Sequence, residues 1–210
     1  MSLNISRLRT VSDSSTTFVG PDRNTAISGA LSGSGTPATN YTPRLYFGWP
    51  GLAPYSNDNG LPKLTPSYVW DSTIGNGERI GVAARTSFIS NPGAIALSIA
   101  VSIAVFCDNA HDTQIQIFRQ GEPFPYATIT PKDTFGVPLP LSDGSMTPID
   151  EPGPTFNWQD IRFYSSNIIL TPADAPYSVV LSIEGQNYIS SGPNPAGIAF
   201  VMDSYFITES

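Results

Sequence analysis

One stretch near the middle of the chain constrains the fold more than any other. Bulky aliphatic side chains occupy every odd position there: Ile95, Leu97, Ile99, Val101, Ile103 and Val105. The even positions between them hold only small residues: Ala96, Ser98, Ala100, Ser102 and Ala104. A period of two places successive side chains on opposite faces of a β-strand. The pattern therefore predicts a strand with one face in a hydrophobic core and a second face that is unusually smooth.

The rest of the second half of the chain also has strand character. Runs of β-branched and aromatic residues, separated by short Gly- and Pro-containing breaks, predict strands at 79–89, 114–118, 126–130, 161–170, 177–183 and 197–207. A short Asp/Asn/His turn makes 114–118 the expected hairpin partner of 95–105, and no segment shows helical periodicity over a helical length. We predict an all-β fold, an antiparallel β-sandwich that is jelly-roll-like, with about seven or eight strands and long Pro/Gly-rich loops.

The first part of the chain has a different composition. Residues 1–42 are rich in Ser, Thr and Gly, which predicts an extended N-terminal arm ordered by its own domain or by a neighbouring subunit. Residues 43–210 are expected to form a single sandwich domain, consistent with a chain of 210 residues. Within that domain, prolines and aromatic residues predict an irregular wrap at 43–77, and the strand-rich body follows at 78–210.

The charge content limits the classes of partner. Only 13% of the residues are charged, and the formal net charge is −7. A protein that binds a nucleic-acid backbone needs clustered Lys and Arg, so we expect no nucleic-acid partner. No apolar run is long enough for a membrane-spanning helix. Residues 1–9 lack the basic start and apolar centre of a secretory signal.

The sequence offers little for catalysis or metal binding. It has one His and one Cys, four residues apart at Cys107 and His111, and too few ligands surround them for a tetrahedral zinc site. Cys107 is expected to be a small buried hydrophobic residue. Asp58, Asp108 and Asp112 are weak calcium candidates, since turn chemistry accounts for them without an ion. We therefore expect a protein that is not an enzyme and has no cofactor.

The first functional hypothesis is a structural protein that self-assembles as a virion, fibre or sheath subunit, located outside the cell or in a virion. A low-charge surface suits packing against identical copies, and a face of Ala and Ser lets another backbone come close. The same face is alternatively covered by the chain's own wrap. The expected assembly face is Ala96, Ser98, Ala100, Ser102 and Ala104. The arm would dock on a neighbouring copy through Phe18, Val19, Ile27 and Leu31.

The alternative hypothesis is a carbohydrate-binding β-sandwich module. Aromatic rings in loops stack on sugar faces, although core packing is the competing interpretation of each Trp. The stretch 197–207 is similar to the closing strand of sugar-binding jelly rolls. Asn4 and Asn40 begin Asn-x-Ser/Thr triplets, whose glycosylation depends on the compartment. The candidate sugar-stacking residues are Trp49, Tyr55, Trp70, Trp158 and Tyr188.

Overall fold

The alternating segment forms the central strand of a sheet that we call sheet A. A computed structural model describes residues 2–41, 48–57, 60–129, 141–151 and 160–210. In it β7 (Ala96–Asp108) buries its bulky face at 0–2% exposure from Leu97 to Val105, as predicted, whereas Ile95 lies just before the strand at 69%. The other strands of sheet A are β11 (Arg162–Leu170), β13 (Gly197–Glu209), β5 (Tyr68–Trp70), β4 (Thr39–Tyr41) and β1 (Leu3–Val11).

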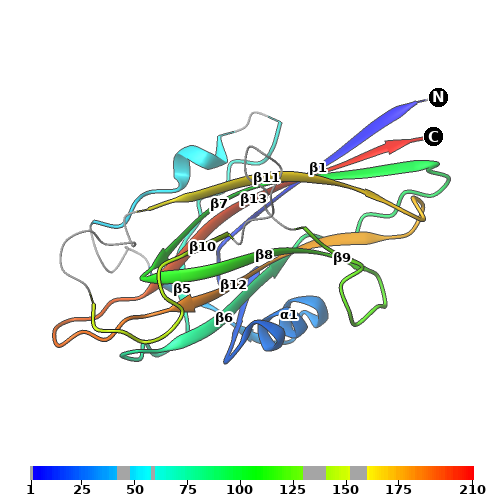
Figure 1. Cartoon of the computed structure of the whole chain (residues 1–210). Coiled ribbons are helices and arrows are strands. Elements are labelled where there is room, and N and C mark those ends of the chain that lie inside the picture. Colours follow the sequence, from blue (N-terminus) through cyan, green and yellow to red (C-terminus); the bar gives the residue numbers. More distant parts are fainter. Residues whose placement is uncertain (1, 42–47, 58–59, 130–140, 152–159) are drawn as a thin grey trace.

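A second antiparallel sheet, sheet B, packs against sheet A (Figure 1). Its order is β10–β8–β12–β6–β2–β3, with β9 beside β8. The bounds are β10 (Leu141–Asp143), β8 (Ala110–Arg119), β12 (Tyr177–Gln186), β6 (Arg79–Arg85), β2 (Thr17–Gly20), β3 (Thr36–Pro37) and β9 (Ala127–Ile129). The prediction of an all-β antiparallel sandwich is confirmed. The described residues form thirteen strands rather than seven or eight, because strands of two to four residues are too short to show a period.

The predicted hairpin between the segments at 95–105 and 114–118 is wrong. β7 pairs with β11 and β13 in sheet A, whereas β8 pairs with β12, β9 and β10 in sheet B. The chain therefore crosses from one sheet to the other at Asp108–Ala110. The crossing lets Ile115 and Ile117 of β8 face the aliphatic side chains of β7 across the core, so both strands bury their odd positions.

The N-terminal segment does not extend away from the domain as an arm. β1 pairs with β13 along its whole length, from Leu3 opposite Glu209 to Val11 opposite Val201. β2 then adds to sheet B beside β6. The four side chains predicted to dock on a neighbour pack on the chain's own sheet B instead: Val19 in the main core, and Phe18, Ile27 and Leu31 around the helix. The arm-exchange prediction is corrected accordingly, because these side chains are already covered.

The same segment contains a helix that periodicity did not predict. α1 (Arg23–Ser32) lies on the outer face of sheet B, over β6, β2 and β12 (Figure 1). Asp22 caps its N-terminus by accepting a hydrogen bond from the Thr25 backbone N–H at 2.8 Å, and Gly33 ends it in the left-handed conformation. These two caps were readable in the sequence. A short 3₁₀ helix, η1 (Ala53–Ser56), lies on the other side of the sandwich. No helix in the described residues is long and apolar enough to cross a membrane.

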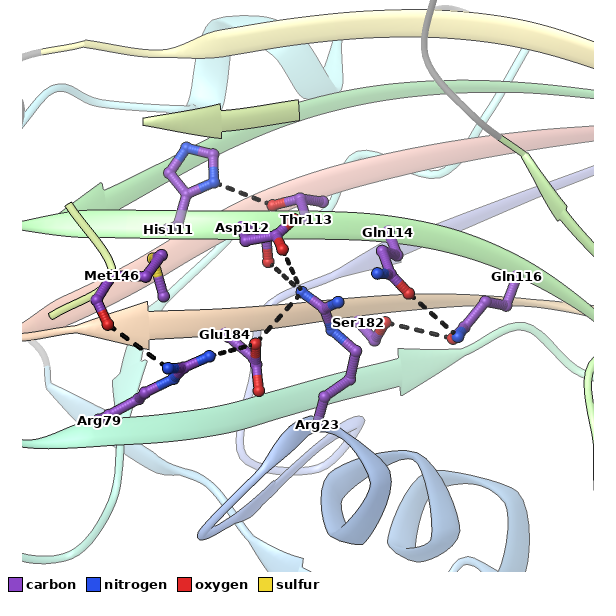
Figure 2. A network of polar contacts seen from close by, with 10 residues as sticks. All are labelled: Arg23, Arg79, His111, Asp112, Thr113, Gln114, Gln116, Met146, Ser182 and Glu184. Atoms are coloured by element: carbon purple, nitrogen blue, oxygen red, sulfur yellow. Dashed lines mark hydrogen bonds and ion pairs between the residues drawn. The ribbon is translucent and has the colours of Figure 1, made fainter. Parts of the chain in front are cut away.

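Arg23 ties the start of α1 to sheet B (Figure 2). Its guanidinium donates to the backbone oxygen of Asp112 at 2.6 Å and lies 3.5 Å from the carboxylate of the same residue. Glu184 is 3.9 Å away and also accepts from Arg79 at 2.7 Å. The Arg23 side chain is only 11% exposed, whereas that of Arg79 is 46% exposed. One buried cation thus links the helix to β8 and β12.

We expect Arg23→Ala to lower the free energy of unfolding by about 2 kcal/mol, because it removes a buried charge-assisted hydrogen bond and leaves carboxylates partly unpaired. Arg79→Ala is the matched control, since it removes a more exposed arginine from the same Glu184 and should cost less than about 1 kcal/mol. Urea denaturation of both variants measures the difference. Equal losses would show that the helix does not depend on Arg23.

Candidate functional site

The smooth outer face of β7 is open to solvent over only part of its length. Ser102 is exposed and Ala100 is half-buried. Ala104, in contrast, is 3% exposed, because it packs with Trp49 and Leu52 in a small second core on the outside of sheet A. The chain's own segment at 48–57 therefore covers one end of this face, as the own-chain alternative expected, and leaves the middle uncovered.

The uncovered part forms a groove whose floor is β7 and whose walls are the neighbouring strands. Ala100 is opposite Asn167 of β11 on one side and Tyr205 of β13 on the other. Ser102 is likewise flanked by Ser165 and Asp203. Small floor residues between longer wall residues leave a depression. We call this depression, from Ala100 to Ala104 along the strand, the β7 groove.

The β7 groove consists of two connected hollows. The larger has a volume of about 450 Å³, and its lining includes Ala100, Asn167 and Tyr205. The smaller, of about 120 Å³, is lined by Tyr55, Phe163 and Asp203. Ser102 lines both hollows, so they are continuous. From position 100 to position 104 the floor runs about 14 Å at the usual strand rise, which is long enough for a short oligosaccharide or a similar extended ligand.

Two aromatic rings stand at the closed end of the groove. Phe163 projects from β11 and Tyr55 from η1, with ring centroids 4.8 Å apart in an edge-to-face arrangement. Their side chains remain 55% and 41% exposed. Adjacent exposed aromatic side chains on a sheet face are unfavourable in water unless a ligand or a partner covers them. The pair therefore gives the groove an aromatic end wall.

The floor beside this end holds a compensated ion pair. Arg9 of β1 donates two hydrogen bonds to the carboxylate of Asp203, each at 2.7 Å. The same guanidinium donates to the backbone oxygens of Ser56 and Pro62. Since the Arg9 side chain is fully buried, this pair fixes the loop that carries Tyr55 against the sheet. Asp203 is the only carboxylate among the described residues that line the two hollows.

The structure does not favour β7 as a place where a foreign strand adds. Both edges of β7 are used, since β11 pairs with it on one side and β13 on the other. Strand addition needs free backbone N–H and C=O groups at a sheet edge, not at a face. The prediction for Ala96, Ser98, Ala100, Ser102 and Ala104 is corrected in this respect: they lie on the outer face of a strand paired on both sides, and Ala100, Ser102 and Ala104 form the floor of a groove.

Three of the five predicted sugar-stacking residues belong to the core. Trp49, Trp70 and Tyr188 are 0–2% exposed, so they present no ring face to a ligand. Their polar atoms are also used: the indole of Trp49 donates to Asp108 at 2.8 Å, and that of Trp70 donates to Glu78 at 2.8 Å. Trp158 lies outside the described residues. Of the four candidates that the structure describes, Tyr55 is the one that lies at the groove.

Sequence reasoning missed Phe163 and Tyr205. Both occupy positions of predicted strands that alternate with core residues, so their outward direction was readable. Their neighbours were not, because pairing of β7 with β11 and β13 joins segments about 60 and 100 residues apart, which no local pattern specifies. An exposed aromatic residue at an outward strand position was the available signal.

The two weak metal candidates that the structure describes, Asp108 and Asp112, have other partners. Burial raises the pKa of Asp108 to about 7, although the hydrogen bond from Trp49 acts in the opposite direction. Asp112 pairs with Arg23, and Asp58 lies outside the described residues. Within the described ranges no group of three or more His, Cys, Asp and Glu is placed to share a metal ion. Cys107 is buried, as predicted, and burial raises the pKa of its thiol.

Comparison with known proteins finds no matching family model and no matching curated protein. Among solved structures, the chain is similar to the enzymatically active domain of tailspike protein 4 from bacteriophage CBA120, at 12% identity and a TM-score of 0.37. That match covers 95% of this chain and 19% of the tailspike chain, so this chain spans about a fifth of its length.

Two carbohydrate-binding modules are also similar. One is TmCBM61, solved in complex with β-1,4-galactotriose, at 10% identity and a TM-score of 0.35, with 96% of this chain and 88% of that chain covered. The other is the CBM36-1 domain of a multidomain xylanase from the hindgut metagenome of Trinervitermes trinervoides, at 8% identity and a TM-score of 0.32, with 93% and 95% covered. At such TM-scores these similarities carry no argument about function, which rests on the residues of the groove.

Proposed function

We propose that this protein binds a neutral glycan in the β7 groove. The observation that carries the proposal is the groove itself: a smooth floor of Ala100 and Ser102 on a rigid sheet, between the ring of Tyr205 and the amide of Asn167. Floor residues with such short side chains leave space on a sheet face that is otherwise filled.

The lining suits the two kinds of surface that a sugar presents. Ring C–H groups pack on aromatic faces, and the groove offers Tyr205 at one wall and Phe163 with Tyr55 at its end. Hydroxyl groups need donors and acceptors, which the serines and the amide of the walls supply. The Asp203 charge is compensated by Arg9, so the lining favours an uncharged polar ligand over an ion.

We further propose that the groove binds its ligand without cleaving it. Glycoside hydrolysis generally uses two carboxyl groups about 5–10 Å apart. The described lining offers only Asp203, and its two oxygens accept hydrogen bonds from Arg9. A single carboxyl group with both oxygens engaged leaves the described lining without the pair of carboxyl groups that hydrolysis generally uses.

The aromatic walls provide the first test. On an array of neutral and acidic glycans we expect binding to neutral oligosaccharides, followed by titration calorimetry with the best ligand. Tyr205→Ala and Phe163→Ala should each raise the dissociation constant about tenfold, a loss of about 1.4 kcal/mol of binding free energy. Phe124→Ala is the matched control, since Phe124 is 78% exposed and lies between β8 and β9 of the other sheet. Its affinity should equal that of the unaltered protein.

Filling the groove provides a second test, which blocks the site and leaves its aromatic walls in place. Ser102 is exposed at the point shared by both hollows, so Ser102→Phe places a ring there without disturbing the core. We expect binding to fall at least about a hundredfold while the melting temperature stays within about 2 °C. Full binding by a folded Ser102→Phe protein would move the ligand site elsewhere and overturn the proposal.

A further inference from the structure

β1 is an edge strand of sheet A, and the backbone groups on its outer edge pair with no other strand among the described residues. The hydrogen bonds between Ser2 and Ser210, and from Ser12 to Phe200, show that even-numbered residues of this segment face β13. In an antiparallel ladder the residues between them point their N–H and C=O groups the other way. The backbone groups of Leu3, Ile5 and Arg7 therefore point to the open edge, where no other described strand pairs with them.

This edge lacks several features with which sheet proteins usually prevent association, and residues 3–6 carry no charged side chain. Long edge strands are typically interrupted by proline, a bulge or an inward-pointing charge. β1 is nine residues long and pairs in continuous register, and it contains neither Pro nor Lys. Leu3 and Ile5 are 67% and 48% exposed on the same face as the β7 groove. Figure 1 shows β1 and the end of β13 side by side at the margin of the molecule.

We propose that β1 pairs with β1 of a second copy of this chain, antiparallel and centred on Ile5. In this register Ile5 is opposite Ile5 of the second copy, and Leu3 is opposite Arg7. The residues with free backbone groups then face one another, which forms about six main-chain hydrogen bonds across a two-fold axis. In β1 of a second copy, the same alternate residues have outward-pointing backbone N–H and C=O groups. The two edges can therefore hydrogen-bond to each other, and no separate partner strand is needed.

Side chains and charge favour the same register. Ile5 is next to the half-buried Ile207 of β13, so the two-fold axis joins two apolar pairs into one row. The two Arg7 side chains do not lie opposite each other. Each is opposite Leu3 of the other copy, and the neighbour of that Leu3 in β13 is the acidic Glu209. The chain as a whole has a net charge of −7, which repels a second copy, whereas β1 contains two arginines and no acidic residue. Association therefore costs least at this edge.

Pairing across this axis makes one continuous sheet in which both copies of sheet A present their outer faces to the same side. The two β7 grooves then open in the same direction. This step rests on the proposed glycan function. If each groove binds a glycan, the dimer attaches bivalently to a surface that displays many copies of the ligand, and its apparent affinity exceeds that of the monomer by about a hundredfold.

Sedimentation velocity over a range of protein concentrations tests the association directly. We expect the mass to rise from 22.4 kDa toward twice that value with a dissociation constant on the order of tens of micromolar, as a small interface implies. Ile5→Pro removes only an N–H that points away from β13, and Ile5→Lys adds a charge at the axis. Both should weaken the association at least tenfold. Ile169→Lys, at the 77% exposed Ile169 on the opposite edge strand β11, is the matched control and should dimerise normally.

Cysteine cross-linking tests the register. Residues in a hydrogen-bonded pair have Cα atoms about 5.5 Å apart, which a disulfide can span. Under copper–phenanthroline oxidation we expect Ile5→Cys to form a covalent dimer and Leu3→Cys to form none. The double variant Leu3→Cys, Arg7→Cys should form a covalent dimer, because position 3 lies opposite position 7 of the second copy. The native Cys107 is 2% exposed and does not compete.

A monomer at the highest concentration, or a dimer lost in Ile169→Lys but kept in Ile5→Pro, would overturn the edge pairing. The glycan proposal is judged separately. The Ile5 variants should bind soluble ligand normally and lose only the avidity on a ligand-coated surface. Ser102→Phe should dimerise normally and lose binding.

Discussion

Gly81→Ala is expected to lower the free energy of unfolding by about 3 kcal/mol and the melting temperature by roughly 6–12 °C. Gly81 lies in β6 directly beneath the start of α1. A Cβ atom at this position would lie 2.1 Å from the backbone oxygen of Asp22 and 2.5 Å from the nitrogen of Arg23. These are backbone atoms, so no side chain can rotate to make room. The helix start must lift from the sheet, which also breaks the contacts of Arg23 with β8 and β12.

Gly192→Ala is the matched control for this substitution. A Cβ atom at Gly192 meets nothing within 4 Å, so the same chemical change should alter the melting temperature by no more than about 2 °C. Differential scanning calorimetry of the two variants compares them. If Gly81→Ala melts together with Gly192→Ala, the helix does not sit on β6 as closely as the structure has it.

The second large effect is a pair of opposing pH dependences at the end of the core. Burial raises the pKa of Asp108 from 3.8 to about 7, and the nearby Glu151 charge adds to this, against the hydrogen bond from Trp49. Between these two values the folded protein binds a proton that the unfolded chain releases. The free energy of unfolding therefore falls as the pH rises through this window. Across the whole window the loss is on the order of 4 kcal/mol, at about 1.4 kcal/mol per pKa unit.

His111 contributes the opposite slope. Burial lowers its pKa from 6.5 to about 4, and the positive charge of Arg162 acts in the same direction. Between these values the unfolded chain binds a proton that the folded protein does not. The free energy of unfolding then rises with pH, by on the order of 3 kcal/mol. The two contributions overlap between about pH 4 and 6.5, where they largely cancel in the unaltered protein.

Neutral replacements separate the two slopes. Asp108→Asn keeps an acceptor for the Trp49 indole and should be most stabilised, relative to the unaltered protein, near pH 8. His111→Asn keeps a polar atom near Thr113, whose hydroxyl lies 3.0 Å from the imidazole. Its loss of unfolding free energy, relative to the unaltered protein, should be smallest near pH 4. Urea denaturation at a series of pH values measures both. The change of each difference with pH is the readout, because a packing cost is the same at every pH. Parallel curves for the three proteins would contradict the assignment.

Much of the fold was predictable because its central elements are locally encoded. The seven strands β6, β7, β8, β9, β11, β12 and β13 all lie within or overlap the predicted segments. α1 was not predicted, since its sequence contains Gly and several Ser and Thr residues and has no continuous apolar stripe. Its apolar residues Ala26, Ile27 and Ala30 are few, and sheet B rather than helix propensity holds them.

The candidate site was only partly predictable. The small residues of the floor, Ala100 and Ser102, stood out in the sequence, as did Tyr55. Trp49 and Trp70 were misassigned because proximity to Pro and Gly does not distinguish a loop platform from a ring folded into the core. Trp49 and Trp70 each bury a large apolar area and satisfy their single N–H inside the protein.

The sequence by itself determined the identity of the strands, the buried face of β7 and its smooth opposite face, because side-chain alternation is a local property of the backbone. Only the tertiary structure decided which strands became neighbours. It sent β7 and β8 into different sheets, placed Phe163 and Tyr205 beside the smooth floor, and folded the first residues back as β1 and α1. Register and partner choice depend on how two sheets bury their apolar faces together, and that free energy is shared among residues far apart in the chain.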